Sequence, residues 1–365
     1  MNYQHWHGLT DGRFGYGSMV NGFLEHVPKG VALHEQASVA VHMGVPFATK
    51  GFLEGQWKVN FTMWETDVLH HRFVAWIPQY DQILVPCEHN VELFSKHHNN
   101  VSYVPLGVDG NVWRPVATEP NEKFRIHGGG SLWKRKGLDI LVQACRLLKF
   151  DHELHIKLAP HARDNPPLNT MPEVRFHRNW MSQADQLQFF NQADMWVCPS
   201  RGEGFGLIPL QAIACAKPTI ITATSGQAQF AHHALDVLPH WKSASGGPGR
   251  WDESDPAALA EMITHHYNHF EEAKRVAAAK RDAAVTEFSW LKASQKLAVA
   301  VPEGHLLADR KFVPIDCKIE FEVNRATEAS VNGREKRFVP GVQYVESEGV
   351  FEVLWHAGYI NKGPL

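Results

Sequence analysis

The sequence has few of the features that mark secreted and membrane-spanning proteins. Cysteine is scarce, with five scattered residues and no C-x-x-C pair, which excludes a disulfide framework and favours reduced thiols in a cytoplasm. The longest apolar runs, such as LIPLQAIACA, are far too short to cross a bilayer. The opening MNYQHWHGLTDGR has no basic segment followed by an apolar core, so we expect no secretory signal and a cytoplasmic location.

Charge of one sign is also missing. Lysine and arginine number 36 against 39 acidic residues, so no global basic field points to nucleic acid, although a local basic patch stays open. Histidine, in contrast, is abundant, at 23 residues. Adjacent histidines point in different directions on a helix or a strand and chelate one metal poorly, so we expect surface or core histidines and no metal site. The adjacent pairs are His70–His71, His97–His98, His232–His233 and His265–His266.

Short β-rich runs alternate with amphipathic stretches over most of the 365 residues, a length typical of two domains. This alternation predicts an α/β fold with parallel sheets covered by helices. The stretch 109–124 is rich in proline and polar residues and divides the runs into two Rossmann-like halves. We expect strands at 30–34, 57–64, 82–87 and 101–107 in the first half, and at 124–130, 153–160, 173–179, 194–200 and 218–224 in the second.

The sequence pattern changes twice in the last third of the chain, first to a helical pattern and then to a strand-like one. Residues 255–301 have a helical pattern, with Asp255 as a cap and Pro256 at the first helical position, and we expect the last long helix to pack back toward the first half. Beyond Pro302, CKIEFEVN alternates like a half-buried strand, and residues 351–358 predict a short helix. The expected domains are therefore 1–115, 116–301 and a small appended α+β module, 302–365.

A glycine-rich turn, RGEGFG, lies between a buried strand and an apolar helix. Ligands bind at the carboxyl ends of parallel strands, and the start of a helix suits phosphate. A carboxylate there would be repelled by phosphate, so Glu203 must face hydrogen-bond donors such as sugar hydroxyls. The alternative is a tight strand-to-helix turn without a ligand, and the local chemistry leaves both interpretations open.

The segment PSRGEGFGLIPLQAIACAKPTII resembles the signature of the retaining glycosyltransferases of family 4, which have the GT-B fold, two Rossmann-like domains whose sheets face a cleft. The resemblance implies that Glu203 lies against the transferred sugar of a nucleotide-diphosphate donor, UDP- or GDP-linked. The second family glutamate, which grips the donor ribose, falls on Gln211. A glutamine keeps an acceptor oxygen but loses the charge, so this difference from the family pattern weakens the assignment of the donor nucleotide.

Four further segments resemble the family in order: DGRFGYGSMVNGFLEHV, VPLGVDGNVWRP, GGGSLWKRKGLDILVQACRLL and TEFSWLKASQKL. The third places Lys136 on the family lysine that meets the diphosphate. The place of the family arginine falls near Ser131, so Lys134 is the expected substitute. The donor-binding residues that the resemblance implies are Gly15, Gly17, Ser131, Lys134, Lys136, Arg201, Gly204, Phe205, Gly206, Leu207 and Gln211.

For the acceptor side, related subgroups have an aromatic-glutamate stretch like NFTMWETDVLHHRF. Glu65 is the candidate, with Trp64 and Asp67 beside it; the alternatives are a carboxylate at a helix start and a core tryptophan. The expected catalytic residues are Glu203, Lys136 and Glu65. The resemblance implies that the departing diphosphate deprotonates the acceptor, with charge stabilisation by Lys136, Lys134 or Arg135 and by the helix after Gly206. No D-x-D motif is present, and we expect no metal and no permanently bound cofactor.

Two alternatives remain at this point. One is a phosphorylase-like or synthase-like enzyme of the same fold, and the other is an inactive GT-B module that binds nucleotide sugar or glycan as a scaffold, which Gln211 favours. The tail faintly resembles modules of bacteriophage proteins, which implies a hydroxymethylated DNA base or a virion protein as acceptor, rather than a lipid or cell-wall glycan. Oligomeric state is left open.

Overall fold

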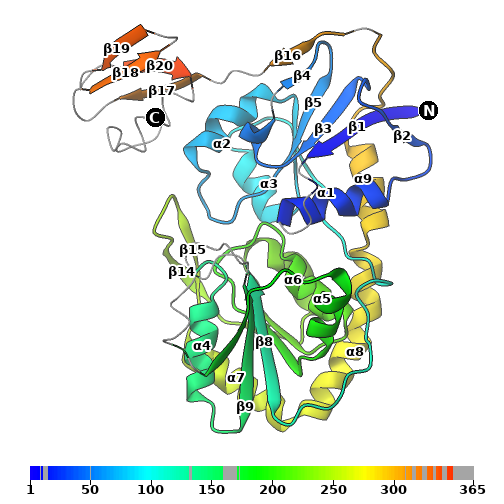
Figure 1. Ribbon diagram of the computed structural model, residues 1–365, viewed down its shortest axis with the longest axis vertical. Coiled ribbons are helices and arrows are strands. Elements are labelled where there is room, and N and C mark those ends of the chain that lie inside the picture. Colours follow the sequence, from blue (N-terminus) through cyan, green and yellow to red (C-terminus); the bar gives the residue numbers. More distant parts are fainter. Residues whose placement is uncertain are drawn as a thin grey trace.

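Two parallel sheets, each covered by helices, form two lobes of the molecule (Figure 1). The computed structural model describes residues 1–8, 10, 15–49, 51–130, 134–158, 171, 173–308 and 310–314, and the backbone of 318–322, 327–331, 334–338 and 343–347. We call the first sheet with α1, α2, α3 and α9 the N-terminal lobe, and the second sheet with α4 to α8 the C-terminal lobe. The predicted α/β architecture with parallel sheets is confirmed.

The N-terminal lobe is built on six parallel strands in the order β2-β1-β3-β5-β6-β7. They are β1 (Asn2–Gly8), β2 (Val31–Leu33), β3 (Val39–Met43), β5 (Trp57–Phe61), β6 (Gln82–Val85) and β7 (Val101–Tyr103). The sequence analysis missed β1 and β3. In β1, polar residues occupy both faces, and Gln4 is fully buried because its amide donates to the carbonyl of Ala298, 3.2 Å away, and its oxygen accepts from Trp6. Because β1 has no alternation of polar and apolar residues, its sequence pattern did not predict a strand.

The helices of this lobe are α1 (Gly15–Glu25), α2 (His71–Trp76), α3 (Glu88–Phe94) and α9 (Trp290–Ala300). One face of the sheet packs against α1 and α9, where Trp6, Phe23 and Trp290 meet edge to face. A second cluster, which includes Phe73, Ile83 and Phe94, fills the space under α2 and α3.

The C-terminal lobe also has six parallel strands, in the order β10-β9-β8-β11-β12-β13. They are β8 (Phe124–Gly130), β9 (His152–Leu158), β10 (Val174–His177), β11 (Met195–Cys198), β12 (Thr219–Thr222) and β13 (Asp236–Leu238). The helices are α4 (Leu138–Leu147), α5 (Gln183–Asn191), α6 (Leu207–Ala214), α7 (Pro256–Asn268), α8 (Phe270–Glu287) and the 3-10 helix η4 (Ser225–His233). The predicted cap is confirmed, since the Asp255 side chain accepts from the backbone N–H of Ala257.

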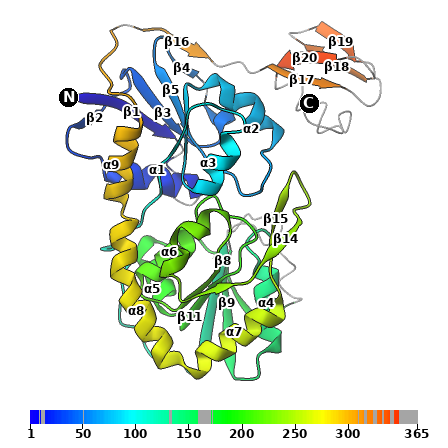
Figure 2. The same cartoon turned by 180° about the vertical axis from the view of Figure 1, so that it is seen from behind.

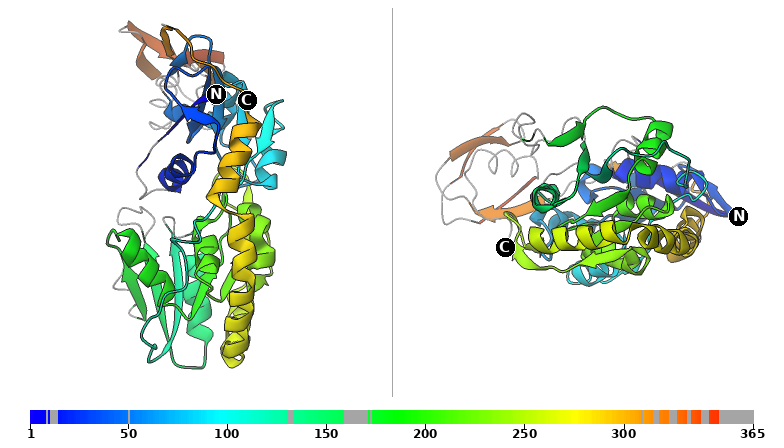
Figure 3. Two further views of the ribbon diagram at one scale, coloured as in Figure 1. Left: turned by 90° about the vertical axis from the view of Figure 1, so that its right-hand side faces the viewer. Right: turned by 90° about the horizontal axis from the view of Figure 1, so that it is seen from below.

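The chain passes twice between the lobes. The first passage is the linker after β7, and the second is the junction of α8 and α9, which run one after the other along the side of both lobes (Figures 2 and 3). The two passages touch, because the N–H of Val108 donates to the carbonyl of Phe288 at 2.7 Å. An added Cβ on Gly22 would lie 2.3 Å from the Trp290 ring, so α9 packs tightly onto α1.

Residues 302–314 continue along the N-terminal lobe. Tyr3 donates its N–H to the carbonyl of Gly304 at 2.9 Å, and β16 (Phe312–Pro314) pairs antiparallel with β4 (Gly51–Leu53). Two antiparallel pairs follow, set apart from both lobes (Figure 1): β17 (Lys318–Glu322) with β20 (Gln343–Ser347), and β18 (Thr327–Val331) with β19 (Arg334–Phe338). The predicted strand in CKIEFEVN corresponds to β17, whereas the helix expected at 351–358 lies outside the described residues. Among the described residues, no helix has the length and apolar composition of a membrane span.

Candidate functional site

The glycine-rich turn lies where the two lobes touch. It joins β11 to α6, and its backbone packs directly against residues 63–65, which follow β5 in the N-terminal lobe. An added Cβ on Gly202 would lie 2.3 Å from the carbonyl oxygen of Glu65, and one on Gly204 would lie 2.4 Å from the sulfur of Met63. These glycines therefore permit close approach of the chain's own second lobe, an occupant that the sequence analysis did not consider.

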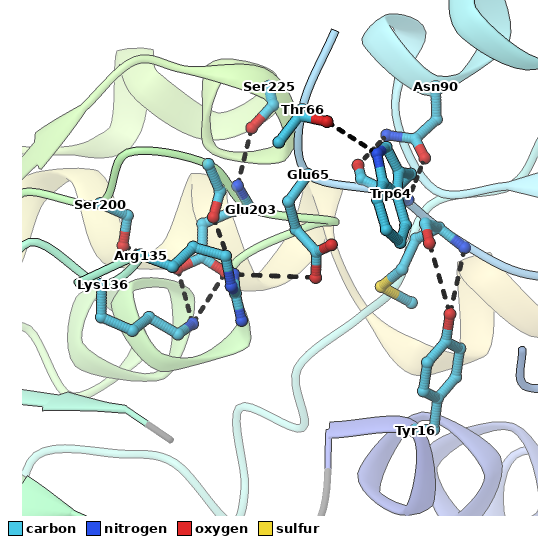
Figure 4. Close-up of polar contacts among 12 residues, drawn as sticks. Tyr16, Trp64, Glu65, Thr66, Asn90, Arg135, Lys136, Ser200, Glu203 and Ser225 are labelled. Atoms are coloured by element: carbon cyan, nitrogen blue, oxygen red, sulfur yellow. Dashed lines mark hydrogen bonds and ion pairs between the residues drawn. The ribbon is translucent and has the colours of Figure 1, made fainter. Parts of the chain in front are cut away.

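Glu203, in the middle of this turn, is a buried carboxylate held by two cations. Its side chain is 5% exposed, and the ammonium of Lys136 lies 2.6 Å and 2.8 Å from its two oxygens. Ser200 donates its hydroxyl to the same carboxylate at 2.7 Å, and a guanidinium nitrogen of Arg135 is 3.4 Å away (Figure 4). Burial by itself would raise the pKa of Glu203, but the charges of Lys136 and Arg135 outweigh it and lower that pKa, so the group is ionised at neutral pH.

The glycine turn is held from two sides, by the start of η4 and by the residues just before α4. The N–H of Glu203 donates to the hydroxyl of Ser225 at 2.8 Å, and the carbonyl of Glu203 accepts from Gly226 at 2.9 Å, both at the start of η4. On the other side, Gly137 has a φ of +64°, and a Cβ there would lie 1.8 Å from the carbonyl oxygen of Pro199. This approach brings Lys136, the residue before it, onto the turn.

Glu65 approaches the same cluster from the N-terminal lobe. Its carboxylate lies 3.8 Å from the guanidinium of Arg135, and that guanidinium also donates to the carbonyl of Gly202 at 2.8 Å. Figure 4 shows Glu65 and Glu203 on opposite sides of Arg135. The three expected catalytic residues are thus brought together, and Arg135, only one of several possible cations in the sequence analysis, is the residue that links them.

The segment that carries Glu65 is anchored by residues that the sequence analysis missed. Asn90, fully buried on α3, accepts from the N–H of Trp64 at 2.6 Å and donates to its carbonyl at 2.9 Å. Tyr16, on α1, bonds Thr62 at 3.1 Å. The indole N–H of Trp64 donates to the carbonyl of Val68 at 2.7 Å, so Trp64 shapes this segment. Its sequence neighbours, Glu88, His89 and Glu92, are polar, so no sequence signal pointed to a buried Asn90.

Asp67 joins the lobes at a second place. The hairpin of β14 (Trp241–Ala244) and β15 (Arg250–Glu253) rises from the C-terminal lobe toward the N-terminal lobe (Figure 1). Asp67 accepts from the backbone N–H and the guanidinium of Arg250 at 2.5 Å and 3.0 Å, and Thr66 donates to the carbonyl of Pro248 at 3.0 Å. Partial burial tends to raise the pKa of Asp67, but the Arg250 hydrogen bonds and charge lower it. Asp67 is therefore an interlobe contact in this structure.

Two expected donor-binding residues have structural partners instead. Arg201 is 5% exposed, and its guanidinium lies 2.7 Å from both Asp139 and Glu253, which ties the turn to α4 and β15. Phe205 is 1% exposed and packs on Phe230 and Phe288 in the core. Both side chains are buried by these partners, and their part in donor binding stays a prediction.

The other donor-side residues are spread over four places. Lys134 is largely exposed and lies 3.0 Å from Asp139. Gly15 and Gly17 are in the first turn of α1, next to Tyr16. Gly206, with φ +106°, precedes Leu207 at the start of α6, and the half-buried Gln211 is on the second turn of that helix. Ser131 lies outside the described residues.

Comparison with protein families gives an assignment over more than half of the chain. Residues 89–297 match the model described as "Family 4 Glycosyltransferase in conflict systems". The chain belongs to this family. The matched residues include the Arg135–Lys136–Glu203 cluster and the whole C-terminal sheet, so the family resemblance inferred from the glycine turn is confirmed at the level of glycosyltransferase family 4.

Known proteins of this kind are similar over part of the chain. The α-maltose-1-phosphate synthase of Mycolicibacterium smegmatis is 24% identical over 216 residues, which are 53% of this chain and 54% of that protein. The chain spans about half the length, or less, of the first curated relatives that it matches.

Among solved structures, sucrose-phosphate synthase from Thermosynechococcus elongatus aligns with a TM-score of 0.58, at 16% identity and 72% coverage of each chain. Anabaena HepE in complex with UDP and glucose aligns with a TM-score of 0.62, at 12% identity, over 82% of this chain and 98% of that one. These neighbours and the two parallel sheets show the GT-B fold.

Proposed function

We propose that this protein is a retaining glycosyltransferase that moves a sugar from a nucleotide-diphosphate donor to a hydroxyl group. The observation that carries the proposal is the buried cluster of Glu203 with Lys136 and Arg135, placed at the carboxyl edge of the second sheet and opposite Glu65 of the other lobe. A buried, ionised carboxylate between two cations is costly to maintain for stability alone. Its place at this edge is where such sheets bind ligands.

The cluster suits a diphosphate leaving group. An ammonium has three N–H donors, and the contacts of Lys136 with Glu203 use two of them, so a third can reach a phosphate oxygen. Arg135 lies 3.4 Å from Glu203 and 3.8 Å from Glu65, so its guanidinium is beside the place proposed for the diphosphate. The start of α6 adds partial positive charge beside Gly206. These groups supply the charge stabilisation for which a metal would otherwise be needed, and we propose metal-independent transfer.

In this proposal the sugar keeps its anomeric configuration, because the acceptor bonds to the same face of the sugar that the diphosphate leaves. The donor sugar lies against Glu203, which accepts hydrogen bonds from its hydroxyls, while the acceptor hydroxyl enters from the side of Glu65. As the bond from the sugar to the diphosphate breaks, a departing phosphate oxygen takes the acceptor proton on the same face. Lys136 and Arg135 stabilise the charge that develops on the diphosphate. The contacts between the lobes exclude water and limit hydrolysis.

We propose a UDP-sugar as the donor, with a GDP-sugar as the alternative. Support comes from the structural neighbour HepE, which was solved with UDP and glucose and with UDP-glucose. Gln211 takes the place of the family's ribose-binding glutamate, so ribose binding is expected to be weaker than with a carboxylate.

For the acceptor, we retain a hydroxymethylated DNA base or a virion protein. The family's description mentions conflict systems and names no acceptor. A DNA base would have to be flipped or single-stranded to reach the site.

The scaffold alternative is kept because of Gln211, and one experiment separates the two. UDP-glucose and GDP-mannose are each added to the protein, and both the melting temperature and the release of free nucleotide diphosphate are measured. The proposed function predicts a higher melting temperature with one donor and slow donor hydrolysis, which Gln211→Glu strengthens through tighter binding. A scaffold would show the thermal shift without nucleotide release in the parent and in Gln211→Glu. Absence of both signals with every donor would overturn the donor assignment.

A further inference from the structure

A cluster of two histidines and a glutamate lies at the junction between the lobes, away from the Glu203 cluster. His232 and His233 end η4, and Glu287 is the last residue of α8. The Nε2 atoms of the two imidazoles lie 3.2 Å and 2.8 Å from the same oxygen, Oε2 of Glu287. Their ring centroids are 3.9 Å apart. The sequence analysis expected adjacent histidines to diverge, but here, just beyond a kink at Phe230, both rings converge on one carboxylate oxygen.

The spacing of these donors is close to that of a tetrahedral metal site. The three ligand atoms all lie within 4.8 Å of one another. Zinc bonds imidazole nitrogen and carboxylate oxygen at about 2.0–2.2 Å, so neighbouring ligand atoms of a tetrahedral site are about 3.3–3.6 Å apart. Small rotations of the side chains, together with a shift of each imidazole proton from Nε2 to Nδ1, would replace the two N–H···O hydrogen bonds by three bonds to one cation. We propose that His232, His233 and Glu287 bind a divalent transition metal, with zinc the best fit, and with water in the fourth position.

The surroundings favour the forms of these groups that bind a metal. The His233 side chain is 6% exposed and packs against Phe288, whereas His232 is 57% and Glu287 49% exposed. One ligand is thus fixed, and the other two leave a path to solvent. Without a metal, burial lowers the pKa of His233, and the hydrogen bonds from the two histidines lower the pKa of Glu287. Lys280, whose charge also acts on His233, opposes the cation to some extent.

The position of the site gives the metal a structural role. Glu287 is followed by Phe288 and Ser289, through which α8 continues into α9 and the chain crosses to the N-terminal lobe. At its other end, η4 begins with Ser225 and Gly226, which hold the backbone of Glu203, and η4 also packs against α3 of the N-terminal lobe. A cation on His232, His233 and Glu287 would therefore tie the crossing point of the chain to the element that supports the glycine turn, and reduce relative motion of the lobes.

The test uses the full chain, without an affinity tag and freed of metal by a chelator. Zinc chloride is titrated by calorimetry at pH 7.5, and cobalt(II) is followed by the visible absorption of tetrahedral sites. We expect one saturable site per chain and a rise in melting temperature with zinc. The variants His232→Gln and Glu287→Gln change exposed side chains and should fold. Each is expected to weaken zinc binding by about tenfold or more and to abolish the cobalt bands, because each removes one of three ligands.

A matched control is the adjacent pair His265–His266 on α7, where Nε2 of His266 lies 3.0 Å from Oδ2 of Asp236. His265→Gln and His266→Gln should leave the affinity for zinc unchanged. The proposal is overturned if zinc binds the His232 and Glu287 variants as tightly as the parent, if the control variants lose the site instead, or if no saturable binding is seen at a tenfold molar excess of zinc. Donor hydrolysis is measured separately, so failure of the glycosyltransferase proposal would not affect this result.

Discussion

At the scale of single residues, Lys136 and Glu203 depend on each other for folding as well as for the proposed chemistry. Lys136→Ala leaves Glu203 buried beside Arg135 alone, and removing one partner of a buried pair costs about 3–5 kcal/mol. It should also lower turnover about 30- to 1000-fold, through a lost contact of about 2–4 kcal/mol with the leaving group. The charge of Glu203 is therefore expected to matter for stability as well as for turnover, through this ion pair.

Thermal melts and donor turnover of Lys136→Ala, Glu203→Gln and the double variant separate the two effects. The double variant should regain part of the melting temperature, since no unpaired charge is left, but no turnover. Lys123→Ala, which breaks an exposed pair with Asp151 just before β8, is the control and should change neither. Turnover of Lys136→Ala within threefold of the parent would contradict a role in the reaction.

The pH dependence of stability follows from the same carboxylate. The pKa of folded Glu203 lies below its ordinary value of 4.5. Its contribution to stability is therefore present above about pH 4.5 and is lost as the pH falls through the folded pKa. The difference in melting temperature between the parent and Glu203→Gln should shrink between pH 5 and pH 3, which calorimetry at stepped pH can measure. A difference that stays constant over this range would mean that the carboxylate is not stabilised in its ionised form.

At the scale of elements, the β14–β15 hairpin closes onto the N-terminal lobe through Asp67 and Arg250. Because Arg250 is 64% exposed, the pair contributes less than about 1 kcal/mol to stability. Its larger effect is expected on opening: Asp67→Asn and Arg250→Ala should raise water-driven donor hydrolysis while the melting temperature changes little. Lys123→Ala breaks an exposed pair with Asp151 within the C-terminal lobe, which does not join the two lobes, and serves as the control. Unchanged hydrolysis in both hairpin variants would show that this contact does not gate the cleft.

At the scale of the whole molecule, the approach of the lobes depends on Gly202. A Cβ there would lie 2.3 Å from a backbone oxygen of Glu65, which cannot rotate away, so Gly202→Ala should force the lobes apart. We expect a larger radius of gyration in solution scattering and a strong loss of turnover. Gly247→Ala, where the nearest atom is 4.0 Å from the added Cβ, is the matched control. If Gly202→Ala scatters like the parent, the turn tolerates a side chain and the lobes are not held together there.

The sequence by itself determined the class of fold and the centre of the candidate site. Alternating β-rich and helical runs depend on neighbours a few residues apart, so they predicted the second sheet except its edge strand β13, and the helices after Asp255. The glycine turn pointed to Glu203, and the resemblance of GGGSLWKRKG to glycosyltransferase family 4 pointed to Lys136, because such motifs keep particular residues at fixed short spacing. The division into domains at 115 and 301 stays a prediction.

The tertiary structure alone decided the residues whose partners are far away in the chain. Strand β1 was hidden because Gln4 is buried through a carbonyl of α9, which lies 294 residues further along. Arg201 pairs with Glu253, and the partner that anchors Trp64 is Asn90, on another element. The same holds for His232 and His233, whose rings converge only because α8 brings Glu287 beside them. Short-range pattern encodes which elements form, whereas hydrogen bonds and ion pairs between distant segments are fixed only when those elements pack.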